Sequence, residues 1–306
     1  MRGRASSQAS SPLRSMSAEP PTLALDIGGT KMAAALVQHG QVVWRAEEAT
    51  PDVRAPEHLV AAAMALVEDT LSTNPARLGV AMTGRVVDGK TYPLNQTTLP
   101  GWTGFDLRAA LSERTALPTT VLNDACAAAW GEYLYGSGRG VREFLFVTVS
   151  TGIGGGLVLG GRLHLAANGL EAELGFTHTD KGPLEYVASG RALDHAAAAR
   201  GWGRAEVLAT RAEAGDADAD ALYTQSAALV AAKLADVAAL LGVTRIALGG
   251  SVGLRRGYLT RVQDALAAFP EVVRPEIVHA ALGKDAGLLG AAAWAGMTFQ
   301  SSECRP

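Results

Sequence analysis

Two glycine-rich turns and one carboxylate at a strand end are the residues of this sequence best suited to phosphate chemistry. In the first turn, LDIGGTK, Gly28 and Gly29 leave backbone N–H groups open to anionic oxygens, because no Cβ intervenes. Thr30 adds a hydroxyl donor and Lys31 a cation, and Asp26 at the end of the preceding strand is placed to hold a hydrated Mg²⁺. A plain β-hairpin turn has the same pattern.

The second turn, VSTGIGGGLVLGG at residues 149–161, repeats the glycine pattern between apolar strands. Ordering a glycine costs roughly 0.5–1 kcal/mol more than ordering an alanine, which indicates that something approaches the backbone closely. A second phosphate-binding hairpin is the natural candidate. Its candidate contacts are Thr151, Gly152, Gly154 and Gly155. A dinucleotide-binding fold is disfavoured, because Leu157 replaces the third glycine of G-x-G-x-x-G and a strand follows instead of a helix.

Residues 84–91, GRVVDGKT, match the P-loop expression G-x-x-x-x-G-K-[ST] letter for letter. The context contradicts the match, because a P-loop lysine opens a helix and a Tyr-Pro pair follows here. The Asp-Gly pair inside the stretch predicts a tight hairpin turn instead. We therefore discard the P-loop interpretation and keep only Gly84 and Arg85 as candidates that face a cleft.

Asn123 and Asp124 lie where a buried strand, TTVLN, meets a predicted helix. Either side chain could cap that helix by accepting hydrogen bonds from its first backbone N–H groups. In a phosphoryl-transfer site, a carboxylate in this position also suits a general base that accepts the proton of an attacking hydroxyl. One residue could do both.

Two further segments supply candidate contacts. Glu173 and Glu185 lie in GLEAELGFTHTDKGPLEY, and ionised carboxylates accept strong, directional hydrogen bonds from sugar hydroxyls, although solvated loop glutamates are an alternative. The strand IALGG ends in glycines, where bare backbone could admit a base or ribose, or simply form a strand-to-helix turn. Its candidate nucleotide contacts are Gly249, Gly250 and Ser251.

Strands and helices that would hold these residues alternate along the chain. Apolar runs predict strands at 22–26, 32–37, 41–46, 78–83, 119–123, 143–149, 156–159, 245–250 and 276–279. Helical spacing predicts helices at 56–71, 124–135, 216–241, 254–268 and 285–296. One strand-glycine-strand unit opens the chain and another opens its second half, which favours two related lobes with a cleft between them.

Composition excludes several classes of protein. The 306 residues carry a formal charge of -3, which gives no basic field for nucleic acid. No apolar run approaches the roughly 18 residues that cross a bilayer, so we expect no membrane partner. Cys126 and Cys304 are the two cysteines, too few for a zinc quartet or a disulfide framework. A reducing cytoplasm fits best.

In this order, the motifs resemble those of the ROK family (repressor, open reading frame, kinase) of sugar kinases over essentially all of residues 22–297. LALDIGGTK resembles the family's first phosphate motif, VLNDACAAAWGE its catalytic Asn-Asp segment, and VSTGIGGG its second phosphate motif. ALGGSVGL followed by GYL, and KDAGLLGAA near the end, resemble segments of the bacterial N-acetylmannosamine kinases, the subgroup of closest resemblance.

The resemblance implies an α/β, actin-like ATPase (ribonuclease H-like) fold, with two lobes around a nucleotide and sugar cleft. We expect residues 1–20 to form a disordered tail. Residues 21–120 together with a C-terminal helix at 285–299 would form a small lobe, and residues 121–284 a larger one. ATP and Mg²⁺ would be the cofactors, with Mg²⁺ held by Asp26 through water, and we expect a homodimer.

The resemblance also assigns roles. Asp124 would be the base and Asn123 a sugar contact. Gly84, Arg85 and Thr98 match positions that contact the sugar in N-acetylmannosamine kinases, and Glu173 and Glu185 match the family's two sugar-binding glutamates. In most members an E-x-G-H segment leads into a cysteine-rich zinc loop. Here Phe176 stands at the histidine position and the loop is cut to THTDKGP, so we expect no zinc site.

The expected reaction is ATP-dependent phosphorylation of N-acetylmannosamine at its 6-hydroxyl, which gives N-acetylmannosamine 6-phosphate, an intermediate of sialic acid breakdown. Phosphorylation of glucose or of another hexose or N-acetylhexosamine is the alternative within the family. A more remote alternative is a sugar-responsive repressor without its DNA-binding domain. That reading needs a winged-helix domain before the first phosphate motif, where about 21 residues show no helix-turn-helix pattern.

Overall fold

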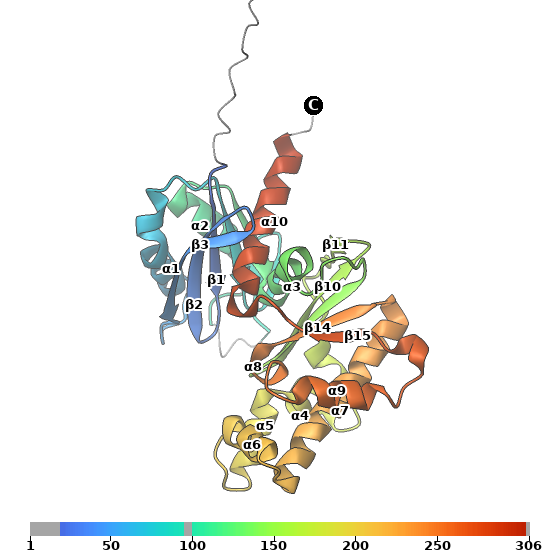
Figure 1. The fold of residues 1–306 in the computed structure, drawn as a ribbon. Coiled ribbons are helices and arrows are strands. Elements are labelled where there is room, and N and C mark those ends of the chain that lie inside the picture. The colour runs from blue at the N-terminus through green and yellow to red at the C-terminus, as the bar shows by residue number, and fades with distance from the viewer. Residues whose placement is uncertain (1–18, 95–99, 304–306) are drawn as a thin grey trace, which may run out of the picture.

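Two five-stranded sheets form the centres of two lobes in the computed structural model, which describes residues 19–94 and 100–303 (Figure 1). The strand order is β3-β2-β1-β4-β8 in the first sheet and β11-β10-β9-β14-β15 in the second. Each sheet therefore contains an antiparallel hairpin beside parallel strands. The recurrence of the strand-glycine-strand unit in the sequence predicts this repetition, and the two sheets confirm it.

The first sheet consists of β1 (Thr22–Ile27), β2 (Lys31–Gln38), β3 (Gln41–Ala49), β4 (Arg77–Met82) and β8 (Thr119–Asn123). β1 pairs antiparallel with β2 and parallel with β4. His39 and Gly40 join β2 to β3 with φ angles of 52° and 73°. Two successive positive φ angles match the right-handed twist of a two-residue hairpin, which is why a glycine stands in this turn.

The second sheet consists of β9 (Phe144–Val149), β10 (Ile153–Leu159), β11 (Arg162–Leu163), β14 (Arg245–Gly249) and β15 (Glu276–His279). β9 pairs antiparallel with β10 and parallel with β14. β9 and β14 are almost continuously apolar and buried, as expected of strands covered on both faces.

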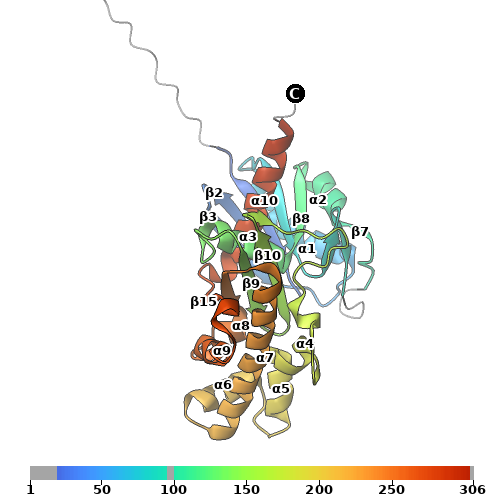
Figure 2. The ribbon, with the colours of Figure 1, turned by 90° about the vertical axis from the view of Figure 1, so that its right-hand side faces the viewer.

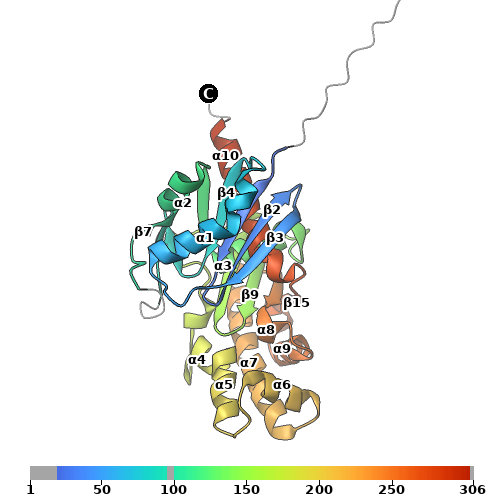
Figure 3. The same ribbon diagram turned by 90° about the vertical axis from the view of Figure 1, so that its left-hand side faces the viewer.

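Helices cover both faces of each sheet. The helices are α1 (Pro56–Leu71), α2 (Leu107–Thr115), α3 (Asp124–Tyr135), α4 (Leu184–Ala188), α5 (Gly190–Ala198), α6 (Ala205–Glu213), α7 (Ala217–Leu241), α8 (Gly250–Gly253), α9 (Tyr258–Leu266) and α10 (Ala286–Glu303). In the first lobe, α1 and α2 pack on one face of the sheet and α10 on the other (Figure 3). In the second lobe, α7 runs under the sheet with α4, α5 and α6 beside it (Figure 2).

Among the described residues, α7 is the one helix long and apolar enough to span a bilayer by length and composition alone. The sequence-based statement that no apolar segment approaches that length is therefore too broad. Tyr223, Val230 and Leu234 on this helix are buried in the core of the second lobe, and core helices of globular lobes meet the same criterion.

α3 and α10 join the two lobes. α3 follows β8 of the first sheet and packs on β10 and β9 of the second, whereas α10 follows β15 of the second and packs on β4 and β1 of the first. The two helices also pack against each other (Figure 1). Their contact is very close, because a Cβ on Gly290 would lie 1.7 Å from the carbonyl oxygen of Ala127 and one on Gly131 would lie 2.3 Å from that of Ala286.

This packing predicts opposite effects for two glycines of the same helix. Gly290→Ala should lower the free energy of unfolding by about 1–3 kcal/mol, because the added methyl group meets backbone that cannot move aside. Gly296→Ala is the matched control, since its nearest neighbour would be Arg77 Nη1 at 3.9 Å. It should stabilise the helix by up to about 1 kcal/mol. Urea unfolding of both variants checks the prediction, and equal effects at the two positions would contradict it.

Most expected elements are confirmed within one to three residues. The stretch that mimics a P-loop forms β5 (Arg85–Val87) and β6 (Lys90–Tyr92), with Asp88 and Gly89 at φ 50° and 81° in the turn and no helix at the lysine. The helix expected at 254–268 is shorter in the structure, because α9 begins only at Tyr258, after Gly257 at φ 78°, and ends at Leu266. The C-terminal helix extends to Glu303, seven residues beyond its expected end at 296.

Several short elements were not expected from the sequence. They are α2, α4, α5, α6, β7 (Phe105–Asp106), β11, β12 (His178–Thr179), β13 (Gly182–Pro183) and the 3₁₀ turns Leu174–Phe176, Glu271–Val273 and Gly283–Asp285. The expected lobe boundary at residue 120 falls inside β8, which pairs with β4 of the first sheet. The first sheet therefore continues to Asn123.

Candidate active site

Asn123 and Asp124 occupy the junction of β8 and α3, and the structure separates their roles. Asn123 Oδ1 accepts a hydrogen bond from the backbone N–H of Cys126 at 3.0 Å, so Asn123 is the helix cap. Its Nδ2 donates to the carbonyl oxygen of Gly84 at 3.0 Å, which ties the β5–β6 hairpin to the helix. Because Asn123 caps the helix, the Asp124 carboxylate is available for another purpose.

Asp26 lies close enough to Asp124 for the Asp124 charge to act on it. Burial, followed by the Asp124 charge, raises the pKa of Asp26 to about 7, although Arg45 partly offsets both. Burial also raises the pKa of Asp124, against hydrogen bonds from the backbone of Ala125 and from the side chains of Asn123 and Thr83. Two crowded carboxylates at the ends of β1 and β8 would be relieved by a divalent cation.

A second group of carboxylates faces Asp124 from the other lobe. Burial, then the charges of Asp124, Glu171 and Glu185, raises the pKa of Glu173 to about 7, and Arg85 acts in the opposite direction. The structure thus brings together the predicted Arg85, Asp124, Glu173 and Glu185. It adds Glu171, which is 5% exposed and accepts a hydrogen bond from the backbone N–H of Ala166 at 3.2 Å. The spacing Glu171-x-Glu173 was the available signal for it.

Glu185 connects the acidic group to the second glycine turn. Its Oε2 accepts a hydrogen bond from the backbone N–H of Ile153 at 3.0 Å. A Cβ on Gly152 would lie 2.5 Å from the same oxygen, so a larger residue there would displace the Glu185 carboxylate. The predicted sugar-side glutamate therefore also holds the predicted phosphate turn in place.

The second turn lies beside the glycines at the end of β14. Ser150 Oγ lies 3.2 Å from Ser251 Oγ, and Thr151 is exposed beside them. Gly249 and Gly250 have packing reasons of their own, because their Cβ atoms would meet the Phe146 ring at 2.7 Å and the Val149 carbonyl oxygen at 2.4 Å.

Part of the glycine signal in the second turn comes from strand packing. Gly154 and Gly155 lie within β10, together with Gly156. A Cβ on Gly155 would lie 2.9 Å from the Ala172 carbonyl oxygen, and one on Gly156 would lie 2.5 Å from the Ala129 Cβ on α3. At Gly155 and Gly156 the atoms that approach the backbone closely belong to the protein's own residues Ala172 and Ala129. The roles of Gly154 and Gly155 in phosphate binding stay predictions.

In the first glycine turn, one glycine has a structural role and the other is open to a ligand. The N–H of Gly28 donates to the Lys31 carbonyl oxygen at 3.1 Å, and its own carbonyl accepts from Thr50 Oγ1 at 2.8 Å. Gly28 therefore closes the hairpin. Gly29 and the exposed Thr30 follow it, and a Cβ on Gly29 would meet nothing within 4 Å. Gly29 is thus the residue of this turn that presents bare backbone to open space.

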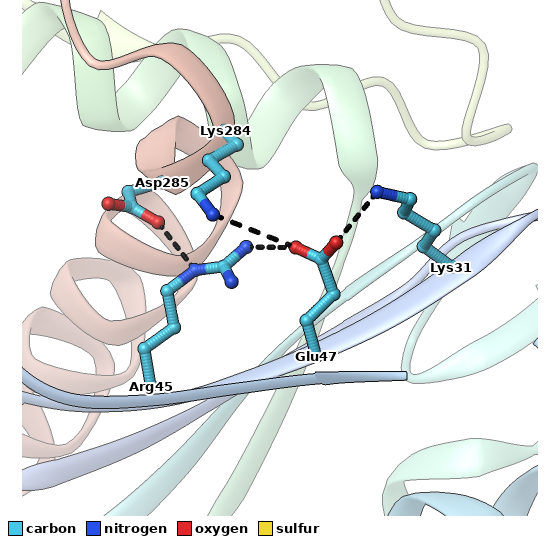
Figure 4. Close-up of polar contacts among 5 residues, drawn as sticks. All are labelled: Lys31, Arg45, Glu47, Lys284 and Asp285. Carbon is cyan, nitrogen blue, oxygen red and sulfur yellow. Dashed lines mark hydrogen bonds and ion pairs between the residues drawn. The ribbon is translucent and has the colours of Figure 1, made fainter. Parts of the chain in front are cut away.

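Lys31 is held by a carboxylate, as Figure 4 shows. Its Nζ lies 2.7 Å from Glu47 Oε1, and Glu47 Oε2 lies 2.6 Å from Arg45 Nη2. Hydrogen bonds from Lys31 and then Arg45 lower the pKa of Glu47 to about 2, so Glu47 stays ionised. A phosphate that binds Lys31 would have to compete with Glu47, which the sequence did not reveal.

Three remaining expectations concern the sugar and metal ions. Thr98 lies outside the described residues, so its role as a sugar contact stays a prediction. Phe176 is 53% exposed, and Arg85 Nε is buried without a hydrogen-bond partner among the described residues.

No group of three or more His, Cys, Asp or Glu side chains suited to a metal ion occurs in the described ranges. Mg²⁺ commonly takes one or two carboxylates plus substrate phosphates, which Asp26 could supply in part.

Comparisons with known proteins agree with this arrangement. Residues 22–297 match the ROK family. An N-acetylmannosamine kinase of Escherichia coli O127:H6 is 42% identical over 285 residues, which cover 89% of this chain and 97% of that kinase. A ROK hexokinase structure from Thermus thermophilus has a TM-score of 0.80 at 30% identity, covering 92% of this chain and 99% of that one. A ROK glucokinase from Streptomyces griseus, solved with glucose and AMPPNP, has a TM-score of 0.76 at 29% identity, covering 90% and 99%.

Proposed function

Because this chain belongs to the ROK family of sugar kinases, we propose that it transfers the γ-phosphoryl group of ATP to the 6-hydroxyl of N-acetylmannosamine. The observation that carries the sugar assignment is the 42% identity to an N-acetylmannosamine kinase over 89% of the chain. The product would be N-acetylmannosamine 6-phosphate.

Asp124 is the proposed base. Its carboxylate lies at the N-terminus of α3, close enough to Asp26 and Glu173 for its charge to raise the pKa of both. It would accept the proton of the sugar hydroxyl as the oxygen attacks the γ-phosphorus. Burial raises its pKa, which makes it a stronger acceptor for that proton than an exposed aspartate would be.

Glu173, Glu185 and Arg85 are the proposed sugar contacts beside Asn123, Gly84 and Thr98. Glu173 would accept hydrogen bonds from sugar hydroxyls, which replace the water lost on binding. Arg85 has donors to offer, since its Nε is buried and unpartnered among the described residues. Phe176 lies largely in solvent and adds no polar contact, so the acidic group around Asp124 must carry most of the recognition.

The nucleotide is proposed to bind between the two glycine turns and residues 249–251. From the first turn, Gly29 offers open backbone and Thr30 a hydroxyl. From the second lobe, Thr151 and Ser251 each offer a hydroxyl. Mg²⁺ at Asp26 would supply charge neutralisation for the phosphates. Lys31 would exchange its contact with Glu47 for a phosphate oxygen. The homodimer also stays part of the proposal.

A sugar panel tests the assignment. Release of ADP should be measured with ATP, Mg²⁺ and each of N-acetylmannosamine, N-acetylglucosamine, glucose and mannose. We expect kcat/KM for N-acetylmannosamine to exceed that for the other sugars by at least about tenfold, a difference of about 1.4 kcal/mol in transition-state binding. Preference for glucose would overturn the sugar assignment and leave the kinase activity intact. Absence of activity with every sugar would overturn the proposed function itself.

A further inference from the structure

Glu132 is a fully buried carboxylate on α3 that no step above uses. It is 0% exposed, and its two oxygens accept hydrogen bonds from three backbone N–H groups. Oε2 accepts from Ser137 at 2.9 Å and Ala281 at 3.0 Å, and Oε1 accepts from Leu282 at 2.7 Å. Charged side chains are seldom buried unless their hydrogen bonds are satisfied, so such a site is costly to maintain without a purpose.

Two of the three donors belong to the segment that carries the chain from one lobe to the other. Residues 280–285 leave β15 of the second sheet and lead into α10, which packs on the first sheet. Glu132 thus holds this crossing segment onto α3. The closeness of α3 and α10 at Gly131 and Gly290 leaves little room for either helix to shift once the segment is held.

The same segment is held from the first lobe at its other end. Asp285 Oδ1 lies 2.9 Å from Arg45 Nε, and Arg45 continues through Glu47 to Lys31 beside the first glycine turn (Figure 4). Lys284 Nζ approaches Glu47 Oε2 at 4.0 Å. A continuous series of polar contacts therefore runs from the first glycine turn to the crossing segment, and from there to α3.

We propose that Glu132 is a positioning residue for phosphoryl transfer. By holding residues 281 and 282 on α3, it fixes the helix that presents Asp124 relative to the Arg45, Glu47 and Lys31 series on the phosphate side. Asp124 lies eight residues before Glu132, about 12 Å along the same helix. A shift of about 1 Å in the position of a reacting group can lower a rate roughly a hundredfold. The hydrogen bonds that hold α3 in place should therefore affect the rate.

Glu132→Gln is the test, because glutamine keeps the shape but can accept through one oxygen only. At least one backbone N–H, from Leu282 or from Ser137 and Ala281, then faces an NH₂ group. We expect kcat for the sugar that the enzyme phosphorylates to fall by about tenfold or more. The KM for that sugar should stay within about twofold, and hydrogen exchange at the amides of Ala281 and Leu282 should accelerate.

Glu113→Gln is the matched control, since Glu113 lies on helix α2 and is exposed. It should change neither kcat nor the exchange of these amides. Unchanged kcat in Glu132→Gln together with faster amide exchange would overturn the proposal, because Glu132 would then have only a structural role. If Glu132→Gln does not fold, Glu132→Asp, which keeps the charge on a shorter side chain, is judged by the same two measurements.

A double variant tests the connection to the phosphate side. If the two ends of the crossing segment act together, Glu132→Gln should cost less in kcat when Arg45→Gln is already present. Strictly additive losses would overturn that connection. The inference rests on Asp124 as the base, and the two can fail separately: an Asp124→Asn variant that keeps its activity refutes the base, whereas the Glu132 variants refute the positioning role.

Discussion

Asp124→Asn should lower kcat by at least about a hundredfold, because a positioned general base contributes roughly 10²–10⁴ in rate. Asparagine has nearly the same shape and can still accept the hydrogen bond that Asp124 Oδ1 receives from the Ala125 N–H at 2.9 Å. The helix cap is also unaffected, because Asn123 supplies it. We therefore expect the loss to fall on the chemical step, while the affinity for the sugar changes by no more than about threefold.

The control for this substitution is Asp106→Asn. Asp106 also precedes a helix, and its Oδ1 caps α2 by accepting a hydrogen bond from the Ala109 N–H at 2.9 Å. Asparagine caps helices about as well as aspartate, so this variant should keep its activity and stability. Single-turnover rates and calorimetric sugar binding should be measured on both variants. Near-full activity of Asp124→Asn would exclude Asp124 as the base.

The sequence predicted the strands and the helix that carry Asp26, Asn123 and Asp124, and the reasons are local, but it did not predict α4, which carries Glu185. Pro56 with a periodic apolar face predicted α1, and TTVLN before Asp124 predicted the β8–α3 junction to the residue. Local context separated the hairpin at residues 84–91 from a true P-loop, because a Tyr-Pro pair follows the lysine and an Asp-Gly pair predicts a turn. The β5–β6 hairpin confirms this prediction.

Contacts between distant residues were beyond sequence reasoning. Lys31 and Glu47 lie 16 residues apart and Arg45 and Asp285 lie 240 apart, and no local pattern joins either pair. The capping choice between Asn123 and Asp124 also required geometry, since both side chains can cap. The glycine pattern was also partly misleading as a sign of phosphate binding, because contacts with distant residues require some of these glycines. Gly155 and Gly156 are required by α3 and by residue 172, which the sequence could not distinguish from a bound phosphate.

Asp26→Asn should make the protein more stable and less active. The folded protein raises the pKa of Asp26 to about 7, chiefly by burial and then by the Asp124 charge. A carboxylic acid with a raised pKa in the folded state favours folding below its unfolded pKa, and this contribution is lost as the pH rises through about 7. At pH 8 the parent protein therefore folds with an unfavourable buried charge, which asparagine removes.

The expected gain in the free energy of unfolding at pH 8 is roughly 1–3 kcal/mol, after allowance for partial solvent access to the side chain. The gain should disappear below about pH 3, where Asp26 is protonated in both the folded and the unfolded state. Urea unfolding at several pH values measures it. Glu173, whose pKa is also raised to about 7, contributes in the same direction and is unchanged in the variant, so the parent's pH dependence should weaken without vanishing.

Activity should change in the opposite direction, by a loss of at least about a hundredfold, since a metal ion contributes several kcal/mol of charge stabilisation at such sites. Mg²⁺ should stabilise the parent at pH 8 and not the variant, because binding to the folded state alone raises stability. A variant that is less stable at pH 8, or that keeps both its activity and its response to Mg²⁺, would contradict this role. Asp26 illustrates why an active-site carboxylate persists although it weakens the fold. Its burial and the nearby Asp124 charge lower the stability of the folded protein, and the same two features would attract a cation and its phosphates.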